Sequence, residues 1–210
     1  MINICVPVLK RYDLLRELIK SCLASNVRPD SYNIIDNGRN NHKLMQAIGD
    51  FDIGIKVHTP RVPLGVAESW NLFIQRVSEE RVIVNDDITF GPNSLETLVA
   101  SKADLIHAHG CGFSCFVLRD SCVEKIGLFD EDISPGYGYY EDEDYLQRID
   151  GRGTRAPSAV MEDVVCGVMH HKSGTLKATT SHTEMLEHHR RFKIAQGNYA
   201  RKWSLEEAFK

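Results

Sequence analysis

The sequence lacks any apolar run long enough to cross a bilayer, which needs about 20 consecutive, mainly apolar residues. A basic region is also lacking before the apolar stretch INICVPV, into which Met1 leads directly, so we expect no secretion leader. These two absences argue against a chain that is inserted into a membrane or exported. We therefore expect a cytoplasmic protein with no stable membrane insertion.

An excess of positive charge is also lacking. Lys and Arg total 25 against 29 Asp and Glu, which gives a formal net charge of −4. Binding along a nucleic-acid backbone depends on such an excess, so any nucleic-acid role would have to be local. The 42% hydrophobic and 26% charged content is instead typical of an ordinary folded domain.

The sequence has no CxxC pair, the spacing typical of zinc and redox sites. Its cysteines are scattered through apolar segments: Cys5, Cys22, Cys111, Cys115, Cys122 and Cys166. A chain of this size does not need disulfides for stability. We therefore expect buried, reduced thiols, and we interpret Cys111 and Cys115 as packing residues on one face of a strand and not as a metal pair.

Internal repeats and low-complexity tracts are absent, and short apolar segments alternate with segments of helical periodicity. The predicted strands are 2–8, 31–38, 55–59 and 81–84, and the predicted helices between them are 13–24, 42–49 and 66–77. This alternation predicts an α/β fold with a mostly parallel central sheet flanked by helices. We expect one domain, 1–180, with a helical extension, 181–210, packed on it.

Carboxylates follow two of the predicted strands directly. The second strand ends in Asp36, Asn37 and Gly38, and Asp86 and Asp87 come directly after the fourth. Ligands of parallel sheets bind beyond the carboxyl ends of the strands, so one crevice could hold all three acids. Adjacent carboxylates repel each other, and a hard divalent cation with oxygen ligands would relieve that repulsion. An Asp-rich turn is the simpler alternative.

Four consecutive acids, Glu141 to Asp144, stand at a predicted loop-to-helix junction. One or two acids in a first helical turn favourably oppose the helix dipole, but four exceed that need. One of them could act as a general base towards an attacking hydroxyl. Further on, His170 and His171 end an apolar run, and because they point oppositely on a strand, at most one can face a given site.

In order, these segments resemble the nucleotide-sugar glycosyltransferases of family two, which have the GT-A fold. The similarity covers roughly residues 2–175. It runs from ICVPVLKRYDLLRELIKSCL, through YNIIDNG, whose terminal acid meets the nucleoside in the family, to PRVPLGVAESWNLFI, which flanks the donor. The resemblance implies donor contacts at Pro7, Asp36, Asn37, Gly65, Asn71, Asn85 and Asp86.

VIVNDDITF looks like the family's DxD-type motif, with Asn85 in place of the first acid. By this resemblance, Asp87 would bind the metal, Asp86 would assist, and His170 of VMHHKSGT would complete the metal site. The implied cofactor is Mn²⁺ or Mg²⁺, and the implied donor substrate is a nucleotide-diphosphate sugar.

FSCFVLRDSCVEKIGLFDED and YYEDEDYLQRI are similar to the acceptor side and the EDxD segment of the family. Asp142 stands in the position of the catalytic base, and Asp144 is a competitor if the helix begins later than predicted. The resemblance implies attack of an acceptor hydroxyl on the anomeric carbon, with inversion.

The acceptor is left open as a glycan, a small molecule or DNA, and the sequence gives no oligomeric state. A phage-type enzyme that modifies hydroxylated DNA bases is one alternative, since HHRRFK (188–193) and ARKW (200–203) could form a local basic patch. We favour the interpretation of that stretch as a solvated helix face. A noncatalytic sugar-nucleotide-binding module is a second alternative, although such a module has no need of a base at Asp142.

Overall fold

The computed structural model describes residues 1–78, 80–151, 159–171 and 181–205. The predicted domain boundary after residue 180 and the last four residues of VMHHKSGT lie outside these ranges. Within them, no helix combines the length and the hydropathy needed to cross a membrane.

The first half of the chain forms the predicted alternation of strands and helices. Its strands are β1 (Ile2–Val8), β2 (Ser31–Asp36), β3 (Ile55–His58) and β4 (Glu80–Val84). Its helices are α1 (Tyr12–Leu23), α2 (Asn41–Ile48) and α3 (Val66–Arg76). The strands lie in the order β3-β2-β1-β4 and pair in parallel, so their carboxyl ends meet at one edge. The second strand ends at Asp36, two residues earlier than predicted, because the chain turns there.

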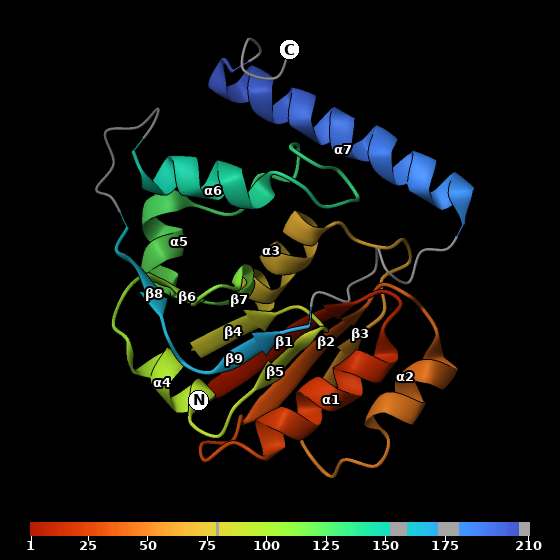
Figure 1. Cartoon of the computed structure of the whole chain (residues 1–210), viewed down its shortest axis with the longest axis vertical. Coiled ribbons are helices and arrows are strands. Elements are labelled where there is room, and N and C mark those ends of the chain that lie inside the picture. The colour runs from red at the N-terminus through yellow and green to blue at the C-terminus, as the bar shows by residue number, and fades with distance from the viewer. Residues whose placement is uncertain (79, 152–158, 172–180, 206–210) are drawn as a thin grey trace.

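The second half completes the sheet. Its elements are β5 (Ile88–Phe90), α4 (Ser94–Ala100), β6 (Leu105–Ala108), β7 (Gly112–Leu118), α5 (Asp120–Ile126), α6 (Glu141–Ile149), β8 (Met161–Val164) and β9 (Val168–His170). The seven-stranded sheet has the order β3-β2-β1-β4-β7-β6-β8, in which β7 runs antiparallel to its neighbours. A separate two-stranded sheet pairs β5 with β9. The predicted mostly parallel α/β sheet is confirmed (Figure 1).

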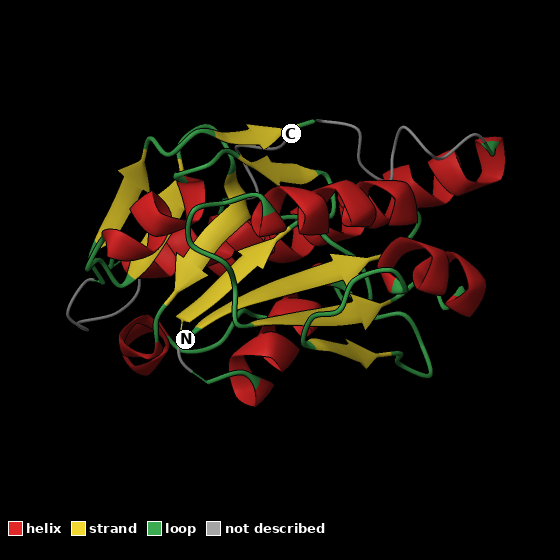
Figure 2. Ribbon diagram, turned by 90° about the horizontal axis from the view of Figure 1, so that it is seen from below, coloured by secondary structure: helices red, strands yellow, loops and turns green. Residues whose placement is uncertain are grey.

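Helices cover both faces of the sheet, as Figure 2 shows. Side chains alternate between the faces along each strand, so Ile4 and Val6 pack with α1, α2 and α4 while Cys5 packs with α3, α5 and α6. The second layer is centred on an aromatic cluster of Trp70, Phe113, Phe116, Phe129 and Tyr145. Burial on both faces explains why the central strands are almost continuously apolar.

All six cysteines are free thiols, as predicted, and four of them are buried. Cys111 is half-buried and lies in the turn before β7, not on that strand with Cys115. The expectation that both lie on one face of a strand is therefore wrong, because two glycines with positive φ, Gly110 and Gly112, turn the chain there.

The last helix, α7 (His182–Trp203), lies across α6 and the loop that enters it (Figure 1). Its buried side chains belong to Ala195, Tyr199 and Ala200, in its second half. Gln196 donates a hydrogen bond to the Tyr140 hydroxyl at 3.0 Å, which ties the helix to the start of α6.

Candidate active site

The turn between β4 and β5 carries the predicted aspartates at the carboxyl edge of the sheet. Asn85 fixes its start, because its backbone amide donates to the Ser114 carbonyl at 2.9 Å and its side chain donates to the Ser114 hydroxyl at 3.2 Å. Asp86 and Asp87 are only 7% and 3% exposed. Two adjacent carboxylates are thus held in a largely desolvated turn.

The β5–β9 ladder brings one histidine to these aspartates. His170 pairs with Ile88 across the ladder, and its Nε2 lies 3.3 Å from Oδ2 of Asp87. His171 instead places Nε2 2.9 Å from the Thr89 hydroxyl, while its backbone amide donates to the Asp87 carbonyl at 2.9 Å. The side chain next to Asp87 is therefore that of His170, as the alternation of a strand requires.

The donor atoms of Asp87 and His170 fit a small divalent cation. Neighbouring ligands of an octahedral ion with bonds of about 2.1 Å are about 3.0 Å apart, close to the 3.3 Å observed here. Across the described residues, no group of three or more His, Cys, Asp or Glu side chains is arranged to hold a metal. Asp87 and His170 could thus hold such an ion as a pair, and Mg²⁺-like ions beside nucleotides usually keep phosphate and water ligands as well.

The electrostatics of the turn also favour a cation. Burial first, and then the neighbouring charge of Asp87, raise the pKa of Asp86 to about 7. Arg11, which directly precedes α1, opposes that rise. Hydrogen bonding to Asp13 is the main cause of the raised pKa of Arg11, and the charges of Asp86 and Asp87 add to it. Arg11 was not among the predicted site residues, although a basic residue directly after the first strand was a signal that could have identified it.

The end of β2 lies at the same edge of the sheet, separated from β4 by β1, and holds Asp36 almost fully buried, with 1% exposed. Oδ1 of Asp36 accepts hydrogen bonds from the Tyr12 hydroxyl at 2.5 Å and the Arg39 amide at 2.9 Å. Pro7, on the adjacent β1, pairs in register with Ile35. Tyr12 thereby fixes the orientation of the carboxylate predicted to meet the nucleoside.

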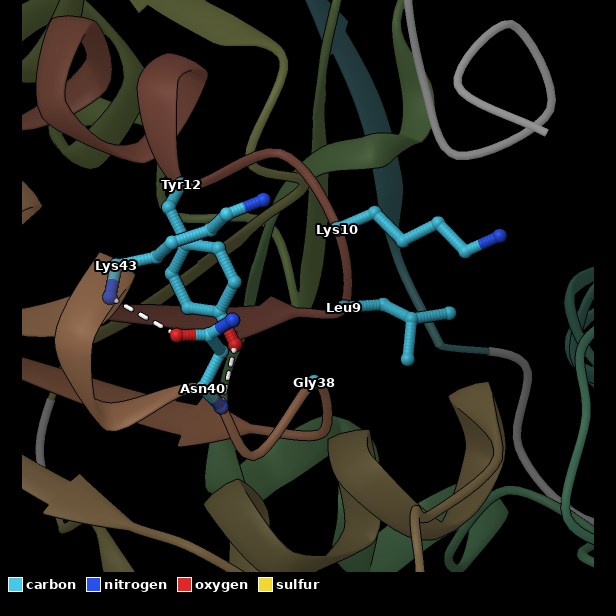
Figure 3. Close-up of a pocket in the computed structure, with 6 residues that line it drawn as sticks. All are labelled: Leu9, Lys10, Tyr12, Gly38, Asn40 and Lys43. Carbon is cyan, nitrogen blue, oxygen red and sulfur yellow. Dashed lines mark hydrogen bonds between the residues drawn. The ribbon is translucent and has the colours of Figure 1, made fainter. Parts of the chain in front are cut away.

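A cavity of about 330 Å³ opens next to Tyr12. It is lined by Leu9, Lys10, Tyr12, Gly38, Asn40 and Lys43 (Figure 3). The Asn40 amide donates to the Tyr12 hydroxyl at 3.2 Å, and the Asn40 side chain accepts from the Lys43 amide at 3.0 Å. A Cβ at Gly38 would lie 2.0 Å from the Leu9 carbonyl, so only glycine allows β1 and β2 to approach so closely here.

Asn37 and Gly65 join the ends of the strands to α3. Asn37 accepts from the Leu64 amide at 2.8 Å and donates to the Ser69 hydroxyl at 3.3 Å. A Cβ on Gly65 would lie 2.4 Å from the Tyr137 carbonyl, which accepts the first amide of α3 at 2.5 Å. Both residues thus shape the entry to α3; their donor contacts remain a prediction.

Asn71 is 3% exposed and is bonded to the loop that leads towards α6. Its side chain donates to the Phe129 carbonyl at 2.9 Å and to Glu131 at 2.8 Å, and it accepts from the Phe129 amide at 2.9 Å. These bonds position the loop, a role that the sequence did not indicate.

The four acids of α6 have very different surroundings. Asp144 is fully buried, and its oxygens accept from Arg148, Trp203 and Lys202 at 3.0, 3.0 and 2.6 Å. Asp142 is half-buried at the start of the helix, where Oδ1 accepts from the Glu143 amide at 2.9 Å.

Glu141, the first residue of α6, is also buried. One of its oxygens accepts the Tyr139 amide at 2.5 Å, so the side chain fixes the loop that enters the helix. Burial first, and then the charge of Asp142, raise the pKa of Glu141 to about 7.

The structure thus gathers Asp86, Asp87, His170 and Arg11 around one turn, with Asp36 two strands away along the same edge of the sheet. The contact between Tyr137 and the start of α3 brings the loop before α6 to the same edge of the sheet. Asp144, by contrast, points into the contact between α6 and α7 and away from solvent.

A comparison with protein-family models finds no match, and a comparison with curated protein sequences finds none. Solved structures do match. A mannosyltransferase, PcManGT from Pyrobaculum calidifontis, in complex with GDP-Man and Mn²⁺, is 12% identical, with a TM-score of 0.60 over 79% of this chain and 56% of that one. TarS 1-349 from S. aureus in complex with UDP-GlcNAc is 14% identical, with a TM-score of 0.57 over 79% and 56%.

Glucosyl-3-phosphoglycerate synthase from Mycobacterium tuberculosis, in complex with Mn²⁺, UDP and glucosyl-3-phosphoglycerate, covers 98% of this chain and 80% of that one. It is 13% identical, with a TM-score of 0.62. This chain spans little more than half the length of the mannosyltransferase and TarS chains. At such low identity the likeness concerns the fold, and the chain has the GT-A fold of nucleotide-sugar glycosyltransferases.

Proposed function

We propose that this protein is a metal-dependent, inverting glycosyltransferase of the family-two type. It moves a sugar from a nucleotide-diphosphate sugar to an acceptor hydroxyl. The observation that carries the proposal is the pair of Asp87 and His170, 3.3 Å apart, in a buried acidic turn at the carboxyl edge of a GT-A sheet. Solved structures with this fold bind GDP-Man, UDP or UDP-GlcNAc, two of them with Mn²⁺.

Asp87 and His170 would hold Mn²⁺ or Mg²⁺, with Asp86 and Asn85 shaping the turn. The bound ion would supply Lewis-acid neutralisation of the leaving diphosphate. Arg11 adds a guanidinium at the same turn, which suits phosphate oxygens. Asp36, oriented by Tyr12, would face the nucleoside.

Asp142 is our choice for the base that accepts the proton of the attacking hydroxyl. A general base must reach that proton, and Asp142 is partly exposed at the loop end of α6. Asp144 is a poor choice because Arg148, Lys202 and Trp203 occupy its oxygens in a site with no exposed surface. Attack from the face opposite the leaving diphosphate would invert the anomeric carbon.

The acceptor is a hydroxyl of a glycan or a small molecule, or a hydroxylated DNA base as the alternative. The rival of another class is a noncatalytic module that binds the nucleotide sugar without turnover. Both binding and chemistry must therefore be measured.

The test combines binding with turnover. Nucleotide diphosphates are screened for thermal stabilisation with and without Mn²⁺, since a ligand of the native state raises the melting temperature. We expect one nucleotide to stabilise the protein strongly, and only with metal. Release of that nucleotide from its sugar conjugate should then fall by about 10² to 10⁴ fold in Asp142→Asn, with donor affinity retained. No stabilisation by any nucleotide would refute the proposal. Binding without turnover would instead favour the noncatalytic module.

A further inference from the structure

A second cavity, of about 170 Å³, lies away from the aspartate turn, between α7 and the loop before α6. Figure 1 shows this loop beside α7. Ser134 and Tyr137 line it from the loop, and Arg190, Arg191 and Ile194 line it from the helix. Nothing in the proposed reaction so far uses these two arginines.

The two guanidiniums are held together by one carboxylate. Arg190 donates to both oxygens of Glu187, at 2.7 and 2.8 Å, and Arg191 donates to one of them at 2.6 Å. The Arg191 guanidinium also lies over the Tyr137 ring, 5.3 Å from its centre. Two positive charges thus share one negative charge, which leaves a local excess of positive charge in a chain whose net charge is −4.

Tyr137 connects this cavity to the proposed active site. The Arg191 guanidinium lies over its ring, and its hydroxyl lies 2.7 Å from Nδ1 of His188. Its carbonyl accepts the first amide of α3 at 2.5 Å, directly after Gly65. Four residues further along the same loop, α6 begins at Glu141, next to the proposed base Asp142. The cavity is therefore connected, through this loop, to the start of α6, where the proposed base lies.

We propose that this cavity binds a phosphate group of the acceptor, so that the acceptor is a phosphate ester. Guanidinium forks recognise phosphate oxygens through paired, charge-assisted hydrogen bonds. A phosphate would replace the Glu187 carboxylate as the shared partner of Arg190 and Arg191. The ester is a monoester in a small phosphorylated acceptor or a diester in a nucleic acid. The assignment of the phosphate to an acceptor rests on the proposed function.

Three variants test the site. Arg190→Gln with Arg191→Gln removes both guanidiniums, and Glu187→Gln removes the competing carboxylate. Arg201→Gln, on the same helix but outside the cavity and bonded to Asn198, is the matched control. Melting curves establish that each variant folds, which the partial exposure of these side chains favours, at 60% for Arg190 and 37% for Arg191.

Calorimetric titration with inorganic phosphate at fixed ionic strength is the first readout. We expect the double variant to bind phosphate at least about tenfold more weakly, since it loses the charge-assisted hydrogen bonds of both guanidiniums. Glu187→Gln should bind it more tightly, and Arg201→Gln should match the native protein. Unchanged binding in the double variant, or weaker binding in Glu187→Gln, would overturn the site.

A DNA 12-mer, single- and double-stranded, distinguishes the source of the phosphate. If the native protein binds the 12-mer, the double variant does not, and inorganic phosphate displaces the DNA, the result supports the site. The ligand is then identified as a diester. Binding of inorganic phosphate without the 12-mer supports the site and identifies a monoester. Nucleotide diphosphate with Mn²⁺ should bind the double variant as it binds the native protein. A failure of the donor site can therefore be distinguished from a failure of the phosphate site.

Discussion

Asp144→Asn should destabilise the protein rather than abolish its chemistry directly. Asp144 is 0% exposed, and its two oxygens accept from Arg148, Lys202 and Trp203. An amide can accept at only one of these positions, and its NH₂ group would face a donor at the other. Removing one partner of a buried ion pair typically costs about 3–5 kcal/mol. Lys202 keeps its ion pair with Asp130, at 2.6 Å, when Asp144 is replaced. We therefore expect a loss at the lower end of that range, about 3 kcal/mol.

Urea unfolding at neutral pH measures this loss of free energy of unfolding. For a chain of this size, about 3 kcal/mol corresponds to a fall in melting temperature of roughly 6–12 °C. Asp142→Asn is the matched control, because Asp142 is half-buried and bonded to the adjacent Glu143 amide; it should change stability by less than about 0.5 kcal/mol. If Asp144→Asn unfolds like the native protein but loses turnover, Asp144 is the base and our reasoning from burial is wrong.

Three further predictions concern the metal pair and the response to acid. Asp87→Ala should abolish metal-dependent binding of nucleotide diphosphate with the fold retained, and calorimetry that finds unchanged affinity would contradict the assignment. His170→Ala should weaken Mn²⁺ dependence more than His171→Ala; the reverse order would assign the ligand to His171. Burial raises the pKa of Asp104, but hydrogen bonds led by that from Lys125 outweigh it and lower the value to about 2. The lowered pKa stabilises the fold above the unfolded value near 3.8, so Asp104→Asn should cost about 1–3 kcal/mol at pH 7. The difference in free energy of unfolding between the native protein and Asp104→Asn should fade between pH 4 and pH 2 in acid-unfolding curves. A difference that stays constant over this range would refute the ion-pair explanation.

The arrangement of the sheet could be predicted because its cause is local. Each central strand is apolar on both faces, and each crossover helix has its own apolar stripe. That pattern alone placed Asp36 and Asp87 at the carboxyl edge. The short β5–β9 ladder could not be predicted in the same way, because three-residue strands carry too little periodicity.

The roles of individual polar residues were less predictable, since their partners lie far along the chain. The four acids of α6 look alike in sequence, but the indole of Trp203, 59 positions away, binds Asp144 and not its neighbours. Asn71 is likewise bonded to a loop 58 positions away. Such long-range hydrogen bonds depend on the packed fold, so no local sequence pattern predicts them.

The unequal anchoring of α7 gives the arginine cavity its significance. At its end, Trp203 donates to the buried Asp144, whereas at its start Glu184 pairs with Lys10 through side chains that are 53% and 33% exposed. Exposed pairs of this kind contribute at most about 1 kcal/mol, so the first half of the helix is held mainly by its contacts with the loop before α6. Arg191 lies where that half of the helix meets Tyr137. A phosphate bound there would tie the helix to the loop that positions the proposed base, and binding of the acceptor would thereby order the acceptor side of the site.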